Sequence, residues 1–302
     1  MSEREPERIK YLNFNQLRSF FAVAEHLSFT RAAQALNVGQ PTITTQVKAL
    51  EEHYRVELFQ RLPGGVALSE SGAALLAVAR RIFQHEEEAI GLLEALGGAV
   101  TGTLRVGSVG PFFVMKLLAG LRATHPHLAL TLRTGNSEAI LNEVLEGRLD
   151  VAVVGGGAED SRLTAVPLQR QAVIVFVSRH HRWAERGAIR LAELENEPLV
   201  MREAGSRTRE AFERALRQAR IKPNVVLEVP REAVREAVAE GLGVGILSEA
   251  EFTPDPRLRA LRLLDADAAT EAFAICLQGR RNVRSIAGFM ALAATYADLP
   301  SA

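Results

Sequence analysis

The chain has 302 residues, of which 47% are hydrophobic and 24% are charged, and its formal net charge is zero. This composition excludes extended disorder, and the length is sufficient for two domains. A zero net charge does not indicate a nucleic-acid partner. Residues 8–68, however, have a small positive excess, with seven Lys and Arg against four Glu. The single cysteine, Cys276, excludes a disulfide framework and a metal site built on paired cysteines.

The sequence also lacks the signals of membrane insertion and of common enzymes. Its first residues are polar and charged, and no stretch approaches the roughly 18 consecutive apolar residues that a membrane span requires. No nucleotide-binding glycine motif, nucleophile elbow or HExxH motif is present, and His180 and His181 have no acidic or cysteine partner at metal-ligand spacing. We therefore expect a cytoplasmic protein without a membrane partner, cofactor, metal or catalytic residues.

Residues 28–50, SFTRAAQALNVGQPTITTQVKAL, predict two short helices joined by a tight turn at 37–39. In the second helix, Ile43, Val47 and Leu50 recur at intervals of four and three, which places them on one buried stripe. The opposite face carries short hydroxyl groups and a lysine. Such a face suits a helix that approaches base edges and phosphates.

This pattern resembles the winged helix-turn-helix of LysR-type transcriptional regulators, and the likeness continues through residues 50–61 and the wing sequence PGGVALSESG at 63–72. One departure is Gly39, where the family usually has a serine that could touch a phosphate. The alternative is an ordinary helical hairpin of an enzyme. The resemblance implies double-stranded promoter DNA and a small-molecule effector as partners. The residues expected to meet the DNA are Arg31, Gln40, Pro41, Thr42, Thr44, Thr45, Lys48 and Arg61.

Residues 71–96 contain no proline and precede Gly97 and Gly98, which predicts one long linker helix. Apolar positions alternate by four and three with one polar interruption at Glu86, a heptad pattern typical of pairing with a second helix. A helix packed on its own domain is the alternative. A homodimer would present two recognition helices to a two-fold DNA site, and the family resemblance further implies a homotetramer. The expected dimer contacts are Leu75, Ala79, Ile82, Ala89, Leu93 and Leu96.

Beyond Gly98, short apolar strands alternate with helices. The first α/β unit is expected to contain strands at 103–109, 128–135 and 149–156 and helices at 111–126 and 137–148, an order that implies parallel pairing with right-handed crossovers. The second unit, at about 170–265, is expected to contain strands at 173–177, 198–201, 225–229 and 244–248. A strand at 271–278 and a helix at 283–297 would return to the first unit. Two such subdomains resemble the type 2 periplasmic-binding-protein fold, the effector domain of LysR-type regulators.

Polar side chains follow several of these strands where the next helix begins. Ligands collect beyond the carboxyl ends of strands in open α/β sheets, and helix N-termini favour anions. For each serine, ordinary N-capping is the alternative role. The arginines favour an anionic effector, since guanidinium pairs well with carboxylate or phosphate-like groups. The residues expected to bind the effector are Ser108, Gly110, Asn136, Ser137, Arg202, Glu203, Ser206, Arg207, Thr208 and Arg231.

Residues 135–155 and 230–252 also resemble the branch of the family associated with 2-aminoethylphosphonate catabolism, whose zwitterionic ligand would use both arginines and glutamates. The expected architecture is an all-α winged helix-turn-helix domain, a linker helix and an α/β effector domain of two subdomains. Their expected ranges are 10–68, 69–98 and 101–300, with the effector domain divided into 101–168 plus 270–300 and 169–269. The alternative function is a solute-binding receptor or a transferase in which residues 1–96 serve only for assembly.

Overall fold

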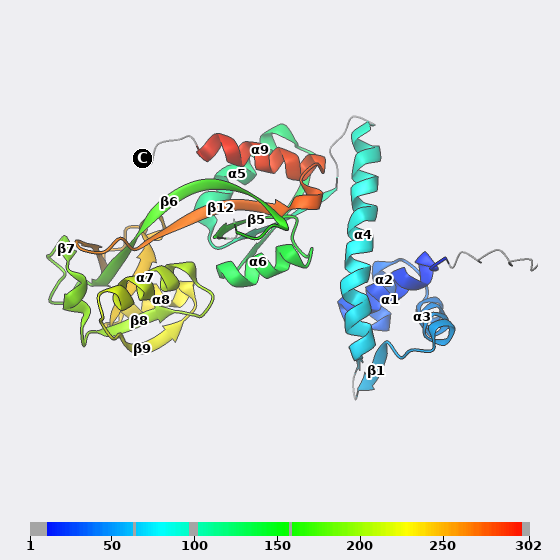
Figure 1. Cartoon of the computed structure of the whole chain (residues 1–302), viewed down its shortest axis with the longest axis horizontal. Coiled ribbons are helices and arrows are strands. Elements are labelled where there is room, and N and C mark those ends of the chain that lie inside the picture. The colour runs from blue at the N-terminus through cyan, green and yellow to red at the C-terminus, as the bar shows by residue number, and fades with distance from the viewer. Residues whose placement is uncertain (1–10, 63–64, 97–101, 157–158, 298–302) are drawn as a thin grey trace, which may run out of the picture. The chain divides into compact units, whose positions relative to one another are not determined.

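The computed structural model describes residues 11–62, 65–96, 102–156 and 159–297, and the chain divides into two units between Glu87 and Glu88 (Figure 1). Each unit is built around its own core. The elements of the N-terminal unit are α1 (Phe14–His26), α2 (Phe29–Ala35), α3 (Gln40–Tyr54), β1 (Phe59–Leu62), β2 (Gly65–Leu68) and the first part of α4 (Glu70–Leu96).

Helix α3 buries the stripe that its sequence predicts. Ile43, Val47 and Leu50 are only 1–2% exposed and belong to one core with α1 and α2. Each such side chain contributes about 1.5–3 kcal/mol by its burial. The side chains of Asn13 and Ser28 accept hydrogen bonds from backbone N–H groups at the starts of α1 and α2. Since this core holds α3 by one face, its opposite face is left in solvent.

The wing is the antiparallel hairpin of β1 and β2, which is tied to α3 by a carboxylate. Glu51 accepts hydrogen bonds from the backbone N–H of Leu58 at 2.7 Å and of Phe59 at 3.3 Å. Gly72, at the start of α4, lies so close to this segment that an added Cβ would be 2.1 Å from the Leu58 carbonyl oxygen. A glycine is therefore required where α4 leaves the wing.

The first part of the predicted heptad stripe is occupied by the N-terminal unit itself, which corrects one predicted dimer contact. Ala79 is fully buried, and Leu75 and Ile82 pack against the same core. Glu86, the polar position in the stripe, forms an ion pair with Arg18 of α1. Because α1 packs along this part of α4, the prediction that Ala79 contacts a partner helix was wrong.

The later part of the stripe is exposed. Ala89 is exposed, Leu93 is 68% exposed and the neighbouring Ile90 is 50% exposed. The side chain of Leu96 lies outside the described residues. These exposed apolar side chains are available to pack against a second helix. The role of this half of α4 in dimerisation therefore remains a prediction.

The C-terminal unit is a pair of α/β subdomains that share two long strands. The strand order is β4-β3-β5-β12-β6-β10-β8-β9, with β11 paired to both β6 and β7. The elements are β3 (Thr103–Ser108), α5 (Pro111–Thr124), β4 (Ala129–Thr134), α6 (Ser137–Leu145), β5 (Val151–Gly155), β6 (Leu163–Ser178), β7 (Ala188–Ile189), η1 (Leu191–Leu194), β8 (Pro198–Arg202), α7 (Arg207–Gln218), β9 (Asn224–Val229), α8 (Arg231–Ala239), β10 (Val244–Ser248), η2 (Glu249–Glu251), β11 (Leu258–Leu263), β12 (Ala269–Leu277), η3 (Gln278–Arg280) and α9 (Arg284–Ala297).

The first subdomain has the parallel βαβαβ core that the sequence predicts, since β3 pairs in parallel with both β4 and β5. Helices α5 and α9 cover one face of its sheet and α6 covers the other (Figure 1). Successive residues of β5 serve the two faces: Val151 and Val153 pack with α5 and α9, whereas Ala152 and Val154 pack with α6. This double burial explains why the strand is an uninterrupted apolar run.

Strand β6 is longer than predicted and forms one of the two connections between the subdomains. The prediction covered only 173–177, whereas β6 has 16 residues and pairs antiparallel with β12, β10 and β11. Pro167 and the polar residues around it interrupt the apolar pattern, so the first half of the strand could not be predicted from periodicity. Pro167 is tolerated beside a register shift, where ladder hydrogen bonding is interrupted. Strands β7 and β11 were not predicted.

The second subdomain is a three-layer arrangement with α7 and α8 on opposite faces of its strands. Phe212 of α7 belongs to one apolar cluster and Val234 of α8 to another, and both are fully buried. Strands β8, β9 and β10 pair in parallel, so their carboxyl ends lie at the same edge. The beginnings of α7 and α8 are therefore brought to that edge, which is where polar residues gather.

Candidate functional site

The predicted DNA-facing side of α3 lies on the surface of the N-terminal unit. Lys48 is 72% exposed, and its one ion pair among the described residues is with exposed Glu52, at 3.4 Å and four positions further along α3. An exposed pair of this kind is worth little and leaves the cation available to a phosphate. The following predicted contacts are all exposed: Arg31, Gln40, Pro41, Thr42, Thr44, Thr45 and Lys48. The side chain of Arg61, in β1, lies outside the described residues.

The start of α3 is organised by local hydrogen bonds. The Gln40 side chain accepts a hydrogen bond from the Thr30 hydroxyl at 3.0 Å, which links α2 to the first turn of α3. The Thr44 hydroxyl donates to the Gln40 carbonyl oxygen at 3.0 Å. Gly39 provides no side-chain cap, Pro41 has no N–H group, and the Thr42 N–H donates to the Gly39 carbonyl oxygen at 3.0 Å. This end of α3 therefore presents exposed side chains rather than a row of free N–H groups.

A second polar site lies in a cleft of the C-terminal unit, where strand ends meet the beginnings of α6, α7 and α8. The cavity has a volume of about 40 Å³, which corresponds to roughly three water molecules. Seven of the ten predicted effector-binding residues line it: Asn136, Ser137, Arg202, Ser206, Arg207, Thr208 and Arg231. The rule that ligands collect at strand ends therefore identified most of its polar wall.

Three predicted residues do not line the cavity. Ser108 is fully buried, and its hydroxyl donates to the Gly110 carbonyl oxygen at 2.6 Å, so it is used within its own turn. Gly110 lies behind a guanidinium group, since an added Cβ there would be 2.0 Å from Nη1 of Arg231. Glu203 accepts two hydrogen bonds of 2.9 Å from Arg202, so it holds a cavity residue rather than facing the cavity.

Several wall residues were missed by the sequence reasoning. Gln171 and Thr270 lie on the connecting strands β6 and β12, where no helix begins nearby in the sequence. Glu251 ends the short helix η2. Ser248 ends β10 and could have been found by the same strand-end rule that found the others. The residues lining the cavity that were not predicted are Val109, Gly155, Gln171, Ser248, Glu251, Thr270, Glu271 and Ala272.

Three helix beginnings contribute positive potential to the cleft. The Asn136 side chain accepts from the Ala139 N–H at 2.9 Å and caps α6, and Ser206 accepts from the Arg209 N–H at 3.4 Å and caps α7. Helix α8 begins at Arg231 after a proline that offers no side-chain cap. The N-terminal ends of helices attract anions, and three of them at one cavity reinforce one another.

Buried charges are concentrated on the same wall. The side chains of Arg202, Arg231 and Glu251 are only 5%, 13% and 9% exposed. Nη1 of Arg231 lies 3.1 Å from Oε1 of Glu251. Burial raises the pKa of Glu251, although Arg231 and Arg202 oppose that rise, and burial lowers the pKa of Arg231. The pair is poorly solvated, and a buried ion pair costs free energy unless each group is well partnered.

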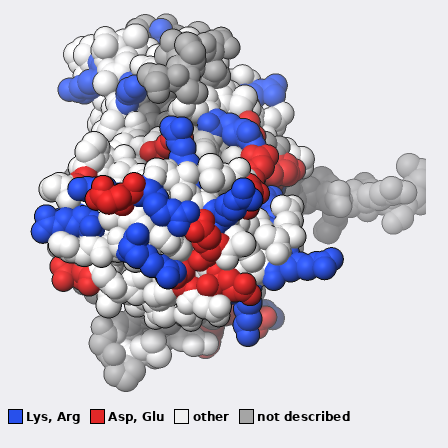
Figure 2. All heavy atoms as spheres, turned by 90° about the vertical axis from the view of Figure 1, so that its left-hand side faces the viewer, with Lys and Arg blue, Asp and Glu red and all other residues white. Residues whose placement is uncertain are grey.

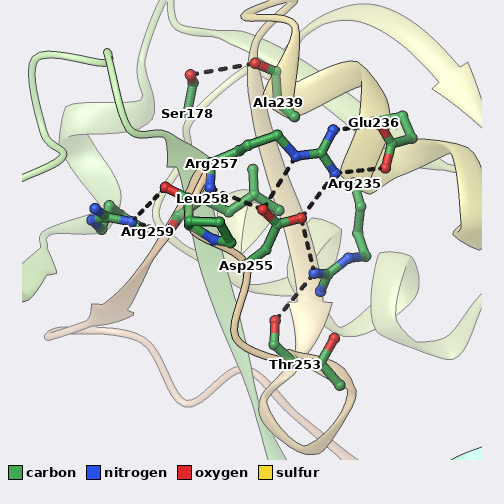
Figure 3. A network of polar contacts seen from close by, with 10 residues as sticks. Ser178, Arg235, Glu236, Ala239, Thr253, Asp255, Arg257, Leu258 and Arg259 are labelled. Carbon is green, nitrogen blue, oxygen red and sulfur yellow. Dashed lines mark hydrogen bonds and ion pairs between the residues drawn. The ribbon is translucent and has the colours of Figure 1, made fainter.

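A polar network fixes the segment that follows Glu251 onto α8 (Figure 3). Asp255 accepts hydrogen bonds from Arg257, which also donates to both carboxylate oxygens of Glu236 at 2.8 and 2.9 Å. Arg235 donates to the Thr253 carbonyl oxygen at 3.1 Å. The hydrogen bonds from Arg257 lower the pKa of Asp255 to about 2. Since α8 carries Arg231 at its start, this network fixes both partners of the cleft ion pair.

Charges on one outer face of this unit do not form a patch of one sign. Figure 2 shows positive and negative side chains interspersed on the face where β7 and β8 lie in Figure 1. Arg186 pairs with Glu193, and Arg182 pairs with Glu197. The anion-attracting features are therefore those of the cleft rather than those of this outer face.

The chemistry of the remaining candidate groups is limited. Cys276 is fully buried in β12, and burial raises the pKa of its thiol to about 11. A thiol with this pKa is protonated at neutral pH and is a poor nucleophile or peroxide sensor. Within the described ranges, no cluster of three His, Cys, Asp or Glu could hold a metal ion, and no helix there is both long and apolar enough to cross a membrane.

Two family models match the chain. Residues 14–73 match a bacterial regulatory helix-turn-helix protein model of the lysR family, and residues 97–298 match the LysR substrate binding domain. The first match contains the whole of α3 and the wing, and the second contains every residue of the cleft. The two sites described above thus coincide with the two domains of one family.

Similar proteins agree with this division. The chain is 32% identical to the HTH-type transcriptional regulator CfxR of Cupriavidus necator over 85% of the chain and 82% of that protein. It is 33% identical to the RuBisCO operon transcriptional regulator of Allochromatium vinosum over 85% of the chain and 86% of that protein. Its fold is similar to full-length OxyR from Pseudomonas aeruginosa, with a TM-score of 0.75, 21% identity and coverage of 94% and 95% of the two chains. The corresponding values for CbnR in complex with its target DNA are 0.69, 23%, 94% and 100%.

These relatives are transcriptional regulators rather than enzymes, which sets aside the solute-binding receptor and the transferase. The expected architecture, an N-terminal helix-turn-helix domain followed by an α/β effector domain, is confirmed. The chain belongs to the LysR family of DNA-binding transcriptional regulators.

Proposed function

We propose that this LysR-family regulator reads promoter DNA with the exposed face of α3 and that a small anionic or zwitterionic effector in the cleft modulates this binding. The observation that carries the effector proposal is the convergence of Arg202, Arg207 and Arg231 with three helix beginnings on one cavity. Guanidinium groups and helix N-termini both favour carboxylate, phosphate or phosphonate groups. A cavity of about 40 Å³ further favours a compact anionic group.

The proposed DNA contacts divide into two kinds. Thr45 and its neighbours Thr42 and Thr44 would meet base edges, whereas Lys48 and Arg31 would meet phosphates. Arg61 and the first turn of α3, with Gln40 and Pro41, complete the proposed surface. Base contacts specify sequence, and phosphate contacts supply affinity that depends on salt. The formation of complexes on the promoter DNA beside the coding region, measured by gel shift across a salt series, tests this assignment.

We propose that the chain acts as a homodimer through the exposed half of α4, and that two dimers form a tetramer. Ala89, Ile90 and Leu93 supply the exposed apolar surface for the dimer contact. The proposed domain ranges remain 10–68, 69–98 and 101–300. Sedimentation of the full chain tests the oligomeric state, and a monomer at micromolar concentration would contradict the dimer.

Effector binding would act by favouring one arrangement of the two subdomains, because the cleft residues come from both of them. Arg202, Ser206 and Arg231 belong to the second subdomain, and Asn136 and Ser137 belong to the first. A ligand shifts such an equilibrium only by its difference in affinity for the two arrangements. Titration calorimetry with a panel of small anions, including 2-aminoethylphosphonate, followed by gel shift with each binder, tests the proposal. Binding without any change in DNA affinity would contradict the regulatory role.

A further inference from the structure

The Arg231–Glu251 pair contains two polar atoms that have no hydrogen-bond partner among the described residues. These are Nε of Arg231 and Oε2 of Glu251, and both are buried. Glu251 lines the cavity with a side chain that is 91% buried; its Oε1 lies 3.1 Å from Nη1 of Arg231, and the Ser248 backbone also contributes a hydrogen bond to the carboxylate. A buried acceptor without a donor destabilises the folded protein, and more so when it is charged. The wall of the cleft thus holds one unmatched donor beside one unmatched acceptor.

The neighbouring groups do not supply the missing donor. Arg202 is engaged by Glu203, and the Ser248 hydroxyl donates to the Gln171 side chain. The charged groups that face Glu251 are Arg231 and Arg202, with Glu232 adding a like charge. The network around Asp255 fixes the segment after Glu251, so the carboxylate is held against the cavity. A ligand in the cavity is therefore placed to supply a donor to Oε2.

We infer that the cleft selects an anion that also carries a hydrogen-bond donor, such as a hydrogen phosphate or an ammonium-bearing phosphonate, and that Glu251 accepts that hydrogen bond. This inference rests on the proposed anionic effector site. The charge of the ligand is attracted by the arginines, and one of its oxygens accepts from Nε of Arg231. Its O–H or N–H donates to Oε2 of Glu251. An anion without a donor places lone pairs against a buried carboxylate and is repelled, which is how such sites reject near-identical ligands.

Phosphate and sulfate test this inference directly, because at pH 8 both are tetrahedral dianions and only phosphate carries a proton. Titration calorimetry on the full chain should show that inorganic phosphate binds at least about tenfold more tightly than sulfate. A tenfold ratio corresponds to about 1.4 kcal/mol, within the cost of one unmatched buried acceptor. Equal affinities would overturn the inference while leaving an anion site in place. Binding of neither anion would overturn the proposed anionic site, and the inference with it.

Two glutamates of η2 provide the variant and its control. In Glu251→Gln the amide can donate to a bare oxyanion, so the ratio of phosphate to sulfate affinity should fall to within about threefold of one. Glu249→Gln should keep the wild-type ratio, since Glu249 is 52% exposed and 3.7 Å from Arg262 at the surface. A wild-type ratio in Glu251→Gln would overturn the assignment to Glu251. If circular dichroism shows that this variant is unfolded, the comparison of phosphate and sulfate on the wild-type protein still decides whether the cleft prefers an anion with a hydrogen-bond donor.

Discussion

Replacement of Arg231 by glutamine tests whether the cleft is organised by a buried ion pair. Arg231 and Glu251 are 13% and 9% exposed and 3.1 Å apart, so Arg231→Gln leaves a carboxylate buried without its cation. Removal of one partner of a buried pair costs about 3–5 kcal/mol. For a domain of this size, each kcal/mol lowers the melting temperature by about 2–4 °C, so the effector domain should melt roughly 10 °C lower at pH 8.

The loss of stability should depend on pH in a defined direction. Burial already raises the pKa of Glu251, and removal of Arg231 removes the largest influence that opposes this rise. A carboxyl group whose pKa is higher in the folded state binds protons on folding, so its folded form is favoured at low pH and weakened as pH rises. Arg231→Gln should therefore regain stability as the pH falls from 8 to 5, because protonation of Glu251 removes the unpaired buried charge.

Differential scanning calorimetry at pH 8 and pH 5 measures this effect. Arg207→Gln is the matched control, because Arg207 lines the same cavity but is 42% exposed and pairs with exposed Glu210. Its melting temperature should change little, although its affinity for anions should fall. The double variant Arg231→Gln with Glu251→Gln should recover stability at pH 8. A pH-independent loss in Arg231→Gln, or no recovery in the double variant, would refute the ion-pair reasoning.

Three further predictions follow from the two sites. Lys48→Ala should weaken binding to all DNA sequences and reduce the slope of log affinity against log salt by about one unit. Thr45→Ala should instead reduce the preference among DNA sequences. Equal effects of Thr45→Ala on binding to specific and to random DNA would contradict its role in base contacts. Gly39→Ser should raise the stability of the N-terminal unit by a few tenths of a kcal/mol and tighten DNA binding. The reason is that an added Cβ there lies 3.6 Å from the nearest atom and the serine hydroxyl can cap α3. A lowered melting temperature would argue against that geometry. Asp255→Asn should weaken anion binding severalfold by loosening the segment after Glu251. Asp160→Asn breaks a similar aspartate–arginine contact between residues that do not line the cavity, and it should leave binding unchanged in calorimetry.

The sequence was sufficient to predict the DNA-reading helix because the relevant signal is local. Ile43, Val47 and Leu50 lie within eight residues of one another, and their spacing alone identifies the buried face. Most of the polar wall of the cleft was also predictable, since Asn136 and Ser206 occupy positions where a strand gives way to a helix. Topology brings the carboxyl ends of parallel strands to one edge whatever their separation in the sequence.

Other parts of the cleft could not be predicted from local pattern. Gln171 and Thr270 lie within β6 and β12, and they reach the cavity only because these strands cross between the subdomains. Ser108 satisfied the strand-end rule, but its hydroxyl turned back to Gly110. A side chain at a strand end can hydrogen-bond within its own turn or point into the cleft. Which of these it does depends on tertiary packing, which cannot be inferred from the local sequence.

By itself, the sequence determined the periodicities, the strand-to-helix turns and hence the class of the protein, because these depend on residues close together along the chain. Only the tertiary structure decided that Ala79 belongs to a core rather than to a dimer seam, and that Glu251 faces Arg231 across 20 positions. Burial and charge pairing are set by neighbours in space, and their energies depend on solvent exclusion that arises only when distant segments pack together.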